Sequence, residues 1–191
     1  MDLSELTFDI GDGIQLREPR NDDAQGLFEL VSRNYSHLRT FMEWIKPDYS
    51  VLDAQQWLDH DIGSRDAMNF LICRGPEIIG TIGFSTFDRD AKVTEMGYWI
   101  DEAEQGKGIV SRACTRLVEL AFAELGMNRI QIRCASANTR SAAIPERLGF
   151  KLEGVQRQHI HRDGKLYDFL IYGLLRNEWR SEGTDRGAGS N

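Results

Sequence analysis

The chain has 191 residues, of which 41% are hydrophobic, so it is long and apolar enough to form one domain with a sizeable core. Its formal charge of −7 argues against a general nucleic-acid binder, because such proteins carry a basic surface. No apolar run could span a bilayer, and the acidic start MDLSELTFDI is unlike a signal peptide. We therefore expect a cytoplasmic protein with no nucleic-acid partner and no membrane partner.

The first half of the sequence predicts a strand, three helices and a pair of strands. Asn21 is the expected N-cap of the first helix, and Ser50 followed by Asp53 has the pattern of a capping box before the third. Gly75-Pro76 is a turn signal between the two paired strands. The expected ranges are 14–17 for the first strand, 22–33, 37–45 and 51–62 for the helices, and 70–73 and 78–87 for the paired strands.

The second half predicts strands that alternate with helices. In the helix expected at 109–125, Val110, Ala113 and Leu117 recur on one face, so this helix should pack on a sheet. Gly149 suits the left-handed C-terminal cap of a short helix at 141–148. The other expected elements are strands at 92–100 and 129–134 and a hairpin of strands 152–161 and 165–175 around Arg162-Asp163-Gly164.

The segment EQGKGIVSR at 104–112 joins an expected strand to an expected helix and has the features of a phosphate-binding loop. Gly106 and Gly108 allow a tight turn, and the free N–H groups of the helix start attract an anion. The GxGxxG motif fails because Ser111 stands in place of its third glycine, and no Gly-Lys-Ser/Thr of a P-loop follows. A simple turn before a helix is the alternative.

A second cluster, NTRSAAIPERLGF at 138–150, decides between these readings when it is taken with GYWI at 97–100 and with QGKGI. In this order the motifs resemble the GCN5-related N-acetyltransferase (GNAT) superfamily and, within it, the RimJ/RimL branch that acetylates N-terminal amines of ribosomal proteins. The resemblance extends over residues 16–179. It implies an α/β (α+β) fold with a mixed, mostly antiparallel sheet of six to seven strands, helices on both faces, and a splay between strands 4 and 5. We expect one domain at 1–180 and a disordered tail at 181–191.

The resemblance also implies acetyl-CoA as cofactor and assigns the residues that hold it. The backbone of Trp99 and Ile100 would pair with the pantetheine amides, and Asn138 would bind the pantetheine or sulfur region unless it only forms a turn. Ala103 departs from the superfamily pattern, which has Gln or Arg there. Arg112 could add charge or be a solvated surface cation, as could the lysine of the loop. The pyrophosphate would lie on Gln105, Gly106, Lys107, Gly108, Ile109 and Val110.

Direct acetyl transfer needs a neutral amine, a base and a proton donor for the leaving thiolate. Many relatives carry a tyrosine donor where this sequence has Pro145, so Ser141 is the expected general acid, with a helix cap as its alternative. Glu95 is the expected base, unless an arginine on a neighbouring strand fixes it structurally. His159 and His161 are further candidates, because imidazole titrates near neutrality.

The acceptor is the least determined part of the hypothesis. A protein N-terminal amine, as on a ribosomal protein, leads; a polyamine or aminoglycoside, and a non-catalytic acyl-CoA-binding module, are the alternatives. A homodimer is compatible with the resemblance. No metal site is expected, because the histidines show no ligand pattern and the odd, widely spaced cysteines indicate buried free thiols. Four aromatic residues line the acceptor pocket or belong to the core: Tyr35, Phe41, Trp44 and Trp57.

Overall fold

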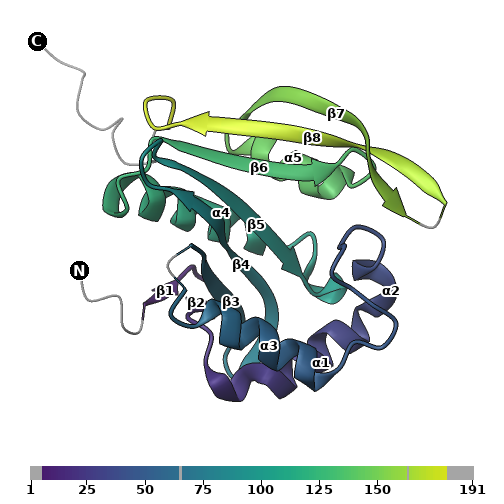
Figure 1. The fold of residues 1–191 in the computed structure, drawn as a ribbon. Helices are drawn as coiled ribbons and strands as arrows, with labels where there is room; N and C mark the ends of the chain where they lie inside the picture. The colour runs from purple at the N-terminus through teal and green to yellow at the C-terminus, as the bar shows by residue number, and fades with distance from the viewer. Residues whose placement is uncertain (1–5, 65, 163, 180–191) are drawn as a thin grey trace, which may run out of the picture.

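One eight-stranded sheet organises the chain (Figure 1). The computed structural model describes residues 6–64, 66–162 and 164–179. The tail expected at 181–191 lies outside these residues, as does Asp163 in the predicted hairpin turn. The strands follow the order β1-β2-β3-β4-β5-β6-β8-β7, with β1 Thr7–Asp9, β2 Ile14–Arg17, β3 Met68–Arg74, β4 Glu77–Asp88, β5 Val93–Ile100, β6 Arg129–Ala135, β7 Lys151–Arg162 and β8 Lys165–Leu175.

The sheet is antiparallel at every pair of neighbouring strands except β5 and β6, which are parallel. This confirms the mixed, mostly antiparallel sheet that the sequence predicted. The eight strands exceed the expected six to seven, and the strand with no predicted range is β1. With only three residues, β1 is too short for alternation of polar and apolar side chains to reveal it.

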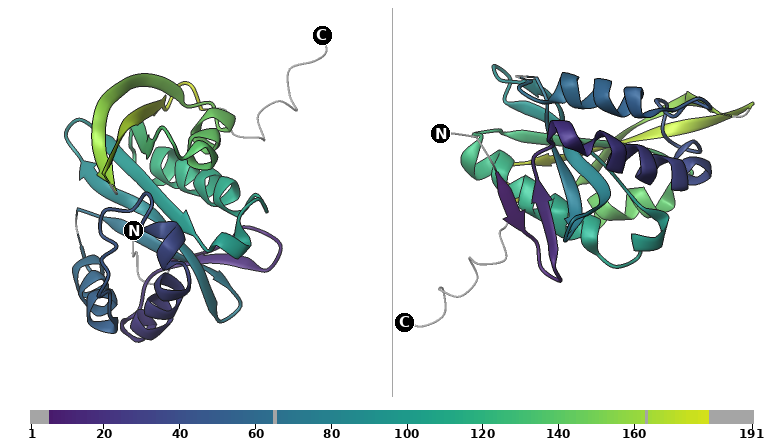
Figure 2. Two further views of the ribbon diagram at one scale, coloured as in Figure 1. Left: turned by 90° about the vertical axis from the view of Figure 1, so that its right-hand side faces the viewer. Right: turned by 90° about the horizontal axis from the view of Figure 1, so that it is seen from below.

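Helices cover both faces of the sheet, as predicted (Figure 2). The helices α1 (Ala24–Arg33) and α3 (Val51–Asp61) pack on one face around Leu71 and Ile78 of the sheet. The helices α4 (Ile109–Glu119) and α5 (Thr139–Arg147) pack on the other. No helix in the described ranges is both long enough and apolar enough to cross a bilayer.

Two predictions at helix starts have different outcomes. The capping box before α3 is confirmed, because the N–H of Ser50 donates to Asp53 Oδ2 at 2.8 Å. The N-cap at Asn21 is wrong: Asn21 lies inside a 3-10 turn, Asn21–Asp23, that precedes α1. There the N–H of Arg20 donates to Asp23 Oδ2 at 2.7 Å, so the carboxylate of Asp23 takes the capping role.

The helix expected at 37–45 is also wrong, because the structure has only the single-turn α2 (Tyr35–Leu38) followed by turns. Tertiary packing explains the difference. The ring of Trp44 lies 5.9 Å from the rings of both Tyr49 and Trp99, an arrangement that turns the chain back over the end of β5. These aromatic contacts outweigh the modest helix propensity of the segment.

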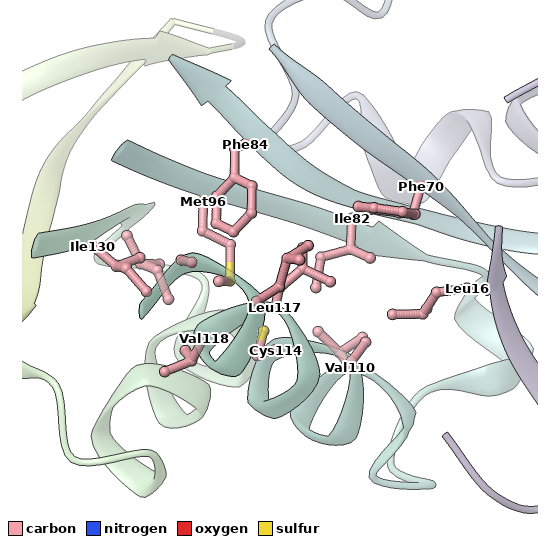
Figure 3. Packing of buried hydrophobic residues seen from close by; sticks show 14 of the residues in the cluster. Leu16, Phe70, Ile82, Phe84, Met96, Val110, Cys114, Leu117, Val118 and Ile130 are labelled. Carbon is pink, nitrogen blue, oxygen red and sulfur yellow. The ribbon is translucent and has the colours of Figure 1, made fainter. Parts of the chain in front are cut away.

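The largest core lies between α4 and the sheet (Figure 3). Val110, Ala113 and Leu117 are buried in this core at helical spacing, as the sequence predicted. The helix continues as a π-helical turn, Leu120–Glu124, in which the N–H of Leu125 donates to the carbonyl of Leu120 at 2.9 Å. This wider turn allows consecutive side chains to be buried at Leu120, Ala121 and Phe122.

The feature that positions the site is the divergence of β5 from β6. Their parallel pairing starts at Val93 with Arg129 and ends at Met96 with Ile132. The last four residues of β5 have no partner on β6, and Figure 1 shows the two strands separating beyond this point. The predicted splay between the fourth and fifth expected strands is therefore confirmed; because β1 is present, these strands are β5 and β6.

Candidate active site

A cleft of about 880 Å³ opens where β5 and β6 separate. Its walls come from α2, the end of β5, the loop that follows β5, the start of α4 and the exposed side of α5. Lys107 and Glu95 are absent from its lining. The structure brings together nine of the expected site residues in this lining: Trp99, Ile100, Gln105, Gly106, Gly108, Ile109, Val110, Asn138 and Ser141.

The loop between β5 and α4 presents a row of unpaired backbone amides. The N–H of Glu104 and that of Gln105 are already used, by the carbonyls of Asp101 and Glu102. From 106 to 111 the described part of the chain offers the amides no acceptor, and helical bonding starts with the N–H of Arg112 donating to Gly108. The loop glycines, at 106 and 108, have φ of +76° and +72°, a conformation that glycine adopts without strain. These amides can bind an anion.

The end of β5 presents a second row of free backbone groups, toward the wedge. The N–H of Asp101 donates to Ile79 of β4 at 2.8 Å, and backbone groups point alternately to the two sides of a strand. Trp99 therefore shares the β4 side, and the backbone groups of Tyr98 and Ile100 face the wedge. Of the two residues expected to pair with pantetheine, only Ile100 has its backbone groups placed for that role, and Trp99 contributes its ring to the lining.

The cations expected to face the phosphates are engaged elsewhere. Lys107 Nζ lies 3.1 Å from Glu104, and Arg112 Nε donates to the carbonyl of Ile10 at 2.8 Å. Two arginines of α5, Arg140 and Arg147, line the cleft instead. Neither arginine was predicted as a site residue, because the helix expected at 141–148 begins after Arg140. In α5 their spacing of seven residues puts both on one face.

Ser141 lines the cleft and is held from two sides. Its N–H donates to Asn138 Oδ1 at 3.1 Å, so Asn138 is the N-cap of α5. Tyr98 Oη donates to the carbonyl of Ser141 at 3.1 Å, and the Ser141 hydroxyl lies 3.5 Å from Tyr98 Oη as a donor. Tyr98 thus ties α5 to β5 across the wedge.

Burial keeps the hydroxyl and thiol groups around Ser141 protonated. It raises the pKa of Tyr98 far above its usual value, and it raises the pKa of Cys134 to about 11, against the opposing effect of a hydrogen bond with Ser141. Tyr98 therefore acts as a neutral donor and not as a base. It was missed in the sequence, although a tyrosine on the core face of a strand signals a hydroxyl that needs a buried partner.

Glu95 lies on the opposite face of the sheet from Ser141. Its Oε1 is 2.8 Å from Arg133 Nη2 on β6, which is the structural pairing that the sequence analysis kept as the alternative. The guanidinium of Arg133 lies 5.4 Å from the ring centroid of Phe169, and Phe169 stacks on His159 at 5.4 Å and 16°. A row of polar and aromatic side chains therefore crosses this face from β5 to β7. His161 is exposed.

The segment after α2 reaches over this face toward the β7–β8 hairpin. Glu43 Oε1 lies 3.6 Å from Arg162 Nη2, which links the two sides. Trp44 is 45% exposed beside Trp99, so it can contact a ligand.

The other three aromatic residues expected at the acceptor pocket have different surroundings. Phe41 lines the cleft, whereas Trp57 packs with the α1–α3 cluster. Tyr35 lies under the Arg39 guanidinium. All three cysteines are buried free thiols, as predicted.

Known proteins with similar sequences agree with this geometry. Residues 14–151 match the acetyltransferase (GNAT) domain. YdaF of Bacillus subtilis (strain 168), named as a candidate ribosomal N-acetyltransferase, is 33% identical over 182 residues, which cover 88% of this chain and 93% of YdaF.

Two solved structures share the fold. RimL, a ribosomal L7/L12 alpha-N-protein acetyltransferase in complex with coenzyme A, has a TM-score of 0.84 at 25% identity and covers 89% of this chain and 98% of its own. MccE, a microcin C7 self-immunity acetyltransferase in complex with acetyl-CoA and AMP, has a TM-score of 0.80 at 28% identity, with 87% and 94% covered. The chain belongs to the GNAT acetyltransferases, the family that its motifs predicted, and acetyl-CoA is the acetyl donor of these enzymes.

Proposed function

We propose that this acetyltransferase moves the acetyl group of acetyl-CoA directly to the N-terminal amine of a protein, with a ribosomal protein in the cytoplasm as the leading acceptor. The observation that carries the proposal is the wedge between β5 and β6. It joins an unpaired strand edge, a row of free amides at 106–111 and the Ser141 hydroxyl in a single cleft. A thioester carried on a long amide-containing arm that ends in a pyrophosphate matches these three features: the thioester at the Ser141 hydroxyl, the arm along the strand edge and the pyrophosphate on the free amides.

The residues fit such a donor without rearrangement of the backbone. Gly106 and Gly108 leave open space where a Cβ would stand, apart from an ordinary contact of 3.6 Å between such an atom on Gly108 and Arg112 Nη1. The amides from Gly106 to Val110 would hold the pyrophosphate, and the wedge-facing groups of Ile100 would hold the pantetheine arm. Gln105 would contribute only its side chain, because its N–H is already bonded to Glu102.

When bound, acetyl-CoA supplies an activated acetyl thioester. We assign to Ser141 the task of donating a hydrogen bond to the thioester sulfur as the C–S bond breaks. Asn138 and Tyr98 support this role, because their bonds to the Ser141 backbone fix the residue in the wall of the cleft. A well-placed donor to developing negative charge contributes about 3 kcal/mol to barrier lowering in well-studied enzymes.

We assign to Glu95 the removal of the amine proton, through a water molecule. Its contact with Arg133 Nη2, at 2.8 Å, holds the carboxylate in place on this face of the sheet. Its position on the open face supports the approach of the acceptor from the side of α1 and α3, opposite to Ser141. The amine nitrogen would then form its bond to the acetyl carbon from one face, while the sulfur leaves toward the other.

A protein N-terminus is favoured because the acceptor face is open and lined by rings and charges that suit an extended peptide. Trp44, Phe169 and His159 offer aromatic surfaces, and Glu43 and Arg162 offer one charge of each sign. RimL, which has the same fold, is named for acting on the alpha-amine of a ribosomal protein. A small amine is the second candidate, because MccE, at 28% identity, is named for immunity to microcin C7 and was solved with AMP.

Release of free CoA thiol from acetyl-CoA, measured with a panel of acceptors, tests the proposal. The panel contains peptides with the N-terminal sequences of ribosomal proteins, the same peptides with blocked N-termini, a polyamine and an aminoglycoside. We expect turnover with free N-terminal peptides and none with the blocked forms. Turnover with the small amines alone would replace the peptide acceptor by the second candidate.

A further inference from the structure

We propose that Arg140 and Arg147 of α5 are the charged half of the phosphate site, with Arg140 on the pyrophosphate of CoA and Arg147 on its ribose 3′-phosphate. The inference rests on the proposed binding of acetyl-CoA in the cleft and adds two residues to it. The sequence motifs pointed instead to Lys107 and Arg112, whose side chains the structure places on Glu104 and on the carbonyl of Ile10.

The two arginines bracket the free amides. Arg140 Nη1 donates to Gln105 Oε1, immediately before the first unpaired amide. Arg147 Nη1 donates to Ser111 Oγ at 2.8 Å, at the last of them. Seven residues of helix separate the arginines by roughly 10.5 Å along the axis, so both lie on the same face of α5. The row of amides at 106–111 therefore has a guanidinium at each end.

The charges of both arginines are available to a ligand. Within the described ranges, no carboxylate lies within 4 Å of either guanidinium, although the chain carries a formal charge of −7. Two carboxylates also line the cleft, those of Glu102 and Glu104. Glu104 is paired with Arg74 at 2.7 Å and with Lys107, so it presents little net charge. The two α5 arginines thus give this wall of the cleft its positive charge.

The known contacts of the arginines orient them without consuming their donors. A guanidinium has five N–H groups in a planar fork that matches phosphate oxygens, and each of these bonds uses one. Gln105 is itself held on its other side, where its Nε2 lies 2.7 Å from His37 Nε2 of α2. This contact holds Gln105, and with it Arg140, at the mouth of the cleft.

The order of groups along the cofactor gives each arginine its phosphate. The thiol end belongs at Ser141, which follows Arg140 directly in the chain. Arg140 is therefore nearer to the thiol than Arg147 is, and the pyrophosphate is nearer to the thiol than the ribose 3′-phosphate is. Arg147, beside the first turn of α4, is placed for the outer phosphate.

Calorimetric titration with CoA and with dephospho-CoA, which lacks the 3′-phosphate, tests both assignments. For Arg140→Gln we expect the Kd of both ligands to rise about fivefold to tenfold, as for a lost charge-assisted contact at an accessible site. For Arg147→Gln we expect a similar rise for CoA and a change of less than twofold for dephospho-CoA. Arg147→Lys, which keeps the charge but not the fork, should lie between wild type and Arg147→Gln.

The matched control is Arg176→Gln, because Arg176 is exposed just beyond β8, at the end of the sheet opposite the wedge. It should leave both Kd values within twofold of wild type. Values within twofold for Arg140→Gln and Arg147→Gln, with wild-type melting curves, would overturn the proposal. An equal rise in the Kd of CoA and of dephospho-CoA for Arg147→Gln would overturn the assignment of Arg147 to the 3′-phosphate. Failure of the wild-type chain to bind CoA at all would overturn the proposed function itself.

Discussion

Ser141 shows how one small side chain can be fixed by its backbone. Its N–H is bonded to Asn138 and its carbonyl to Tyr98, so the residue cannot move without breaking a contact to α5 or to β5. The hydroxyl is the one part free to turn, between Tyr98 and a ligand in the cleft. A proton donor held in this way loses little conformational entropy when it forms its hydrogen bond in the transition state.

Ser141→Ala is expected to lower kcat by about tenfold to a hundredfold while the KM for acetyl-CoA changes less than threefold, because the hydroxyl acts on the leaving sulfur and not on binding. Tyr98→Phe should give a smaller loss of kcat. The double variant should lose no more than Ser141→Ala, since both act through one hydroxyl. Steady-state kinetics measure all three, and additive losses would separate Tyr98 from Ser141.

Glu95→Gln is expected to change the shape of the pH–rate profile. At low pH the acceptor amine is protonated, so the enzyme depends on its base, and the variant should lose most there. At high pH the free amine is abundant, and the two rates should converge. The profile of kcat/KM between pH 6 and 9.5 gives the answer. Parallel profiles for the wild type and the variant would exclude Glu95 as the general base and leave it a structural role in the ion pair with Arg133.

The kind of contact that a residue makes decides whether the sequence alone could reveal its role. Asn138 and the loop glycines act through local backbone geometry, which spacing alone encodes. Tyr98 and the arginines of α5 act across the wedge, between elements more than thirty residues apart. Lys107 and Arg112 carry the right charge close to the free amides, but Lys107 pairs with Glu104 and Arg112 donates to the carbonyl of Ile10, and charge and position alone do not predict these partners.

At the scale of elements, the site is a strand, a loop and a helix that leave their hydrogen-bonding groups unused in one place. β5 is no longer paired with β6 after Met96, and α4 begins with unpaired amides. The helix dipole adds partial positive charge at that end of α4. Because these groups have no partner among the described residues and converge on one cleft, they are available to a ligand, and we read them as a binding feature.

Gly108→Asp is expected to raise the Kd for CoA at least fiftyfold, because it adds a carboxylate to the amide cradle. Gly126→Asp is the matched control, since both glycines have positive φ, of +72° and +69°, and open surroundings. Both substitutions carry a similar strain, on the order of 1 kcal/mol. Equal melting temperatures with unequal CoA affinity, by calorimetry, would support the cradle; retained affinity in Gly108→Asp would contradict it.

The elements themselves were predictable where local patterning dominates. The α4 helix, the capping box of α3 and most strands follow from periodicity and cap residues. The segment after α2 could not be predicted in this way, because Trp44 packs against aromatic rings, one of them remote in the sequence. Strand β1 could not be predicted either, because three residues are too few to show an alternation of polar and apolar side chains. The π-helical end of α4 reflects the fit of a helix onto the core, and sequence periodicity assumes regular turns.

At one edge of the sheet, an ion pair joins two strands that are not neighbours. Arg129 of β6 donates to Glu153 of β7, at 2.6 Å for Nη1 to Oε1, although β8 lies between them. The bridge crosses β8 at Gly173, where an added Cβ would lie 2.5 Å from the Glu153 carboxyl carbon. Because it has no Cβ, Gly173 leaves room for the Arg129–Glu153 ion pair to cross β8.

Glu153→Gln is expected to lower the melting temperature in a pH-dependent way. The hydrogen bond from Arg129 lowers the pKa of Glu153 below its ordinary 4.5, so the pair stabilises the folded state above that pH and loses its effect as pH falls through the lowered value. Because the pair is partly exposed, the expected difference is about 1–3 °C at pH 6–8. It should vanish near pH 3. A difference that stays constant with pH in thermal melts would exclude the linkage.

In the proposed complex, CoA lies in the wedge between β5 and β6 with its pyrophosphate on the amides of the loop before α4. A crystal structure of the chain with CoA would show whether it binds in this way. We expect phosphate oxygens within hydrogen-bonding distance of the N–H groups from Gly106 to Val110, and the thiol beside Ser141. CoA bound outside the wedge, or a pyrophosphate that contacts none of these amides, would contradict the account.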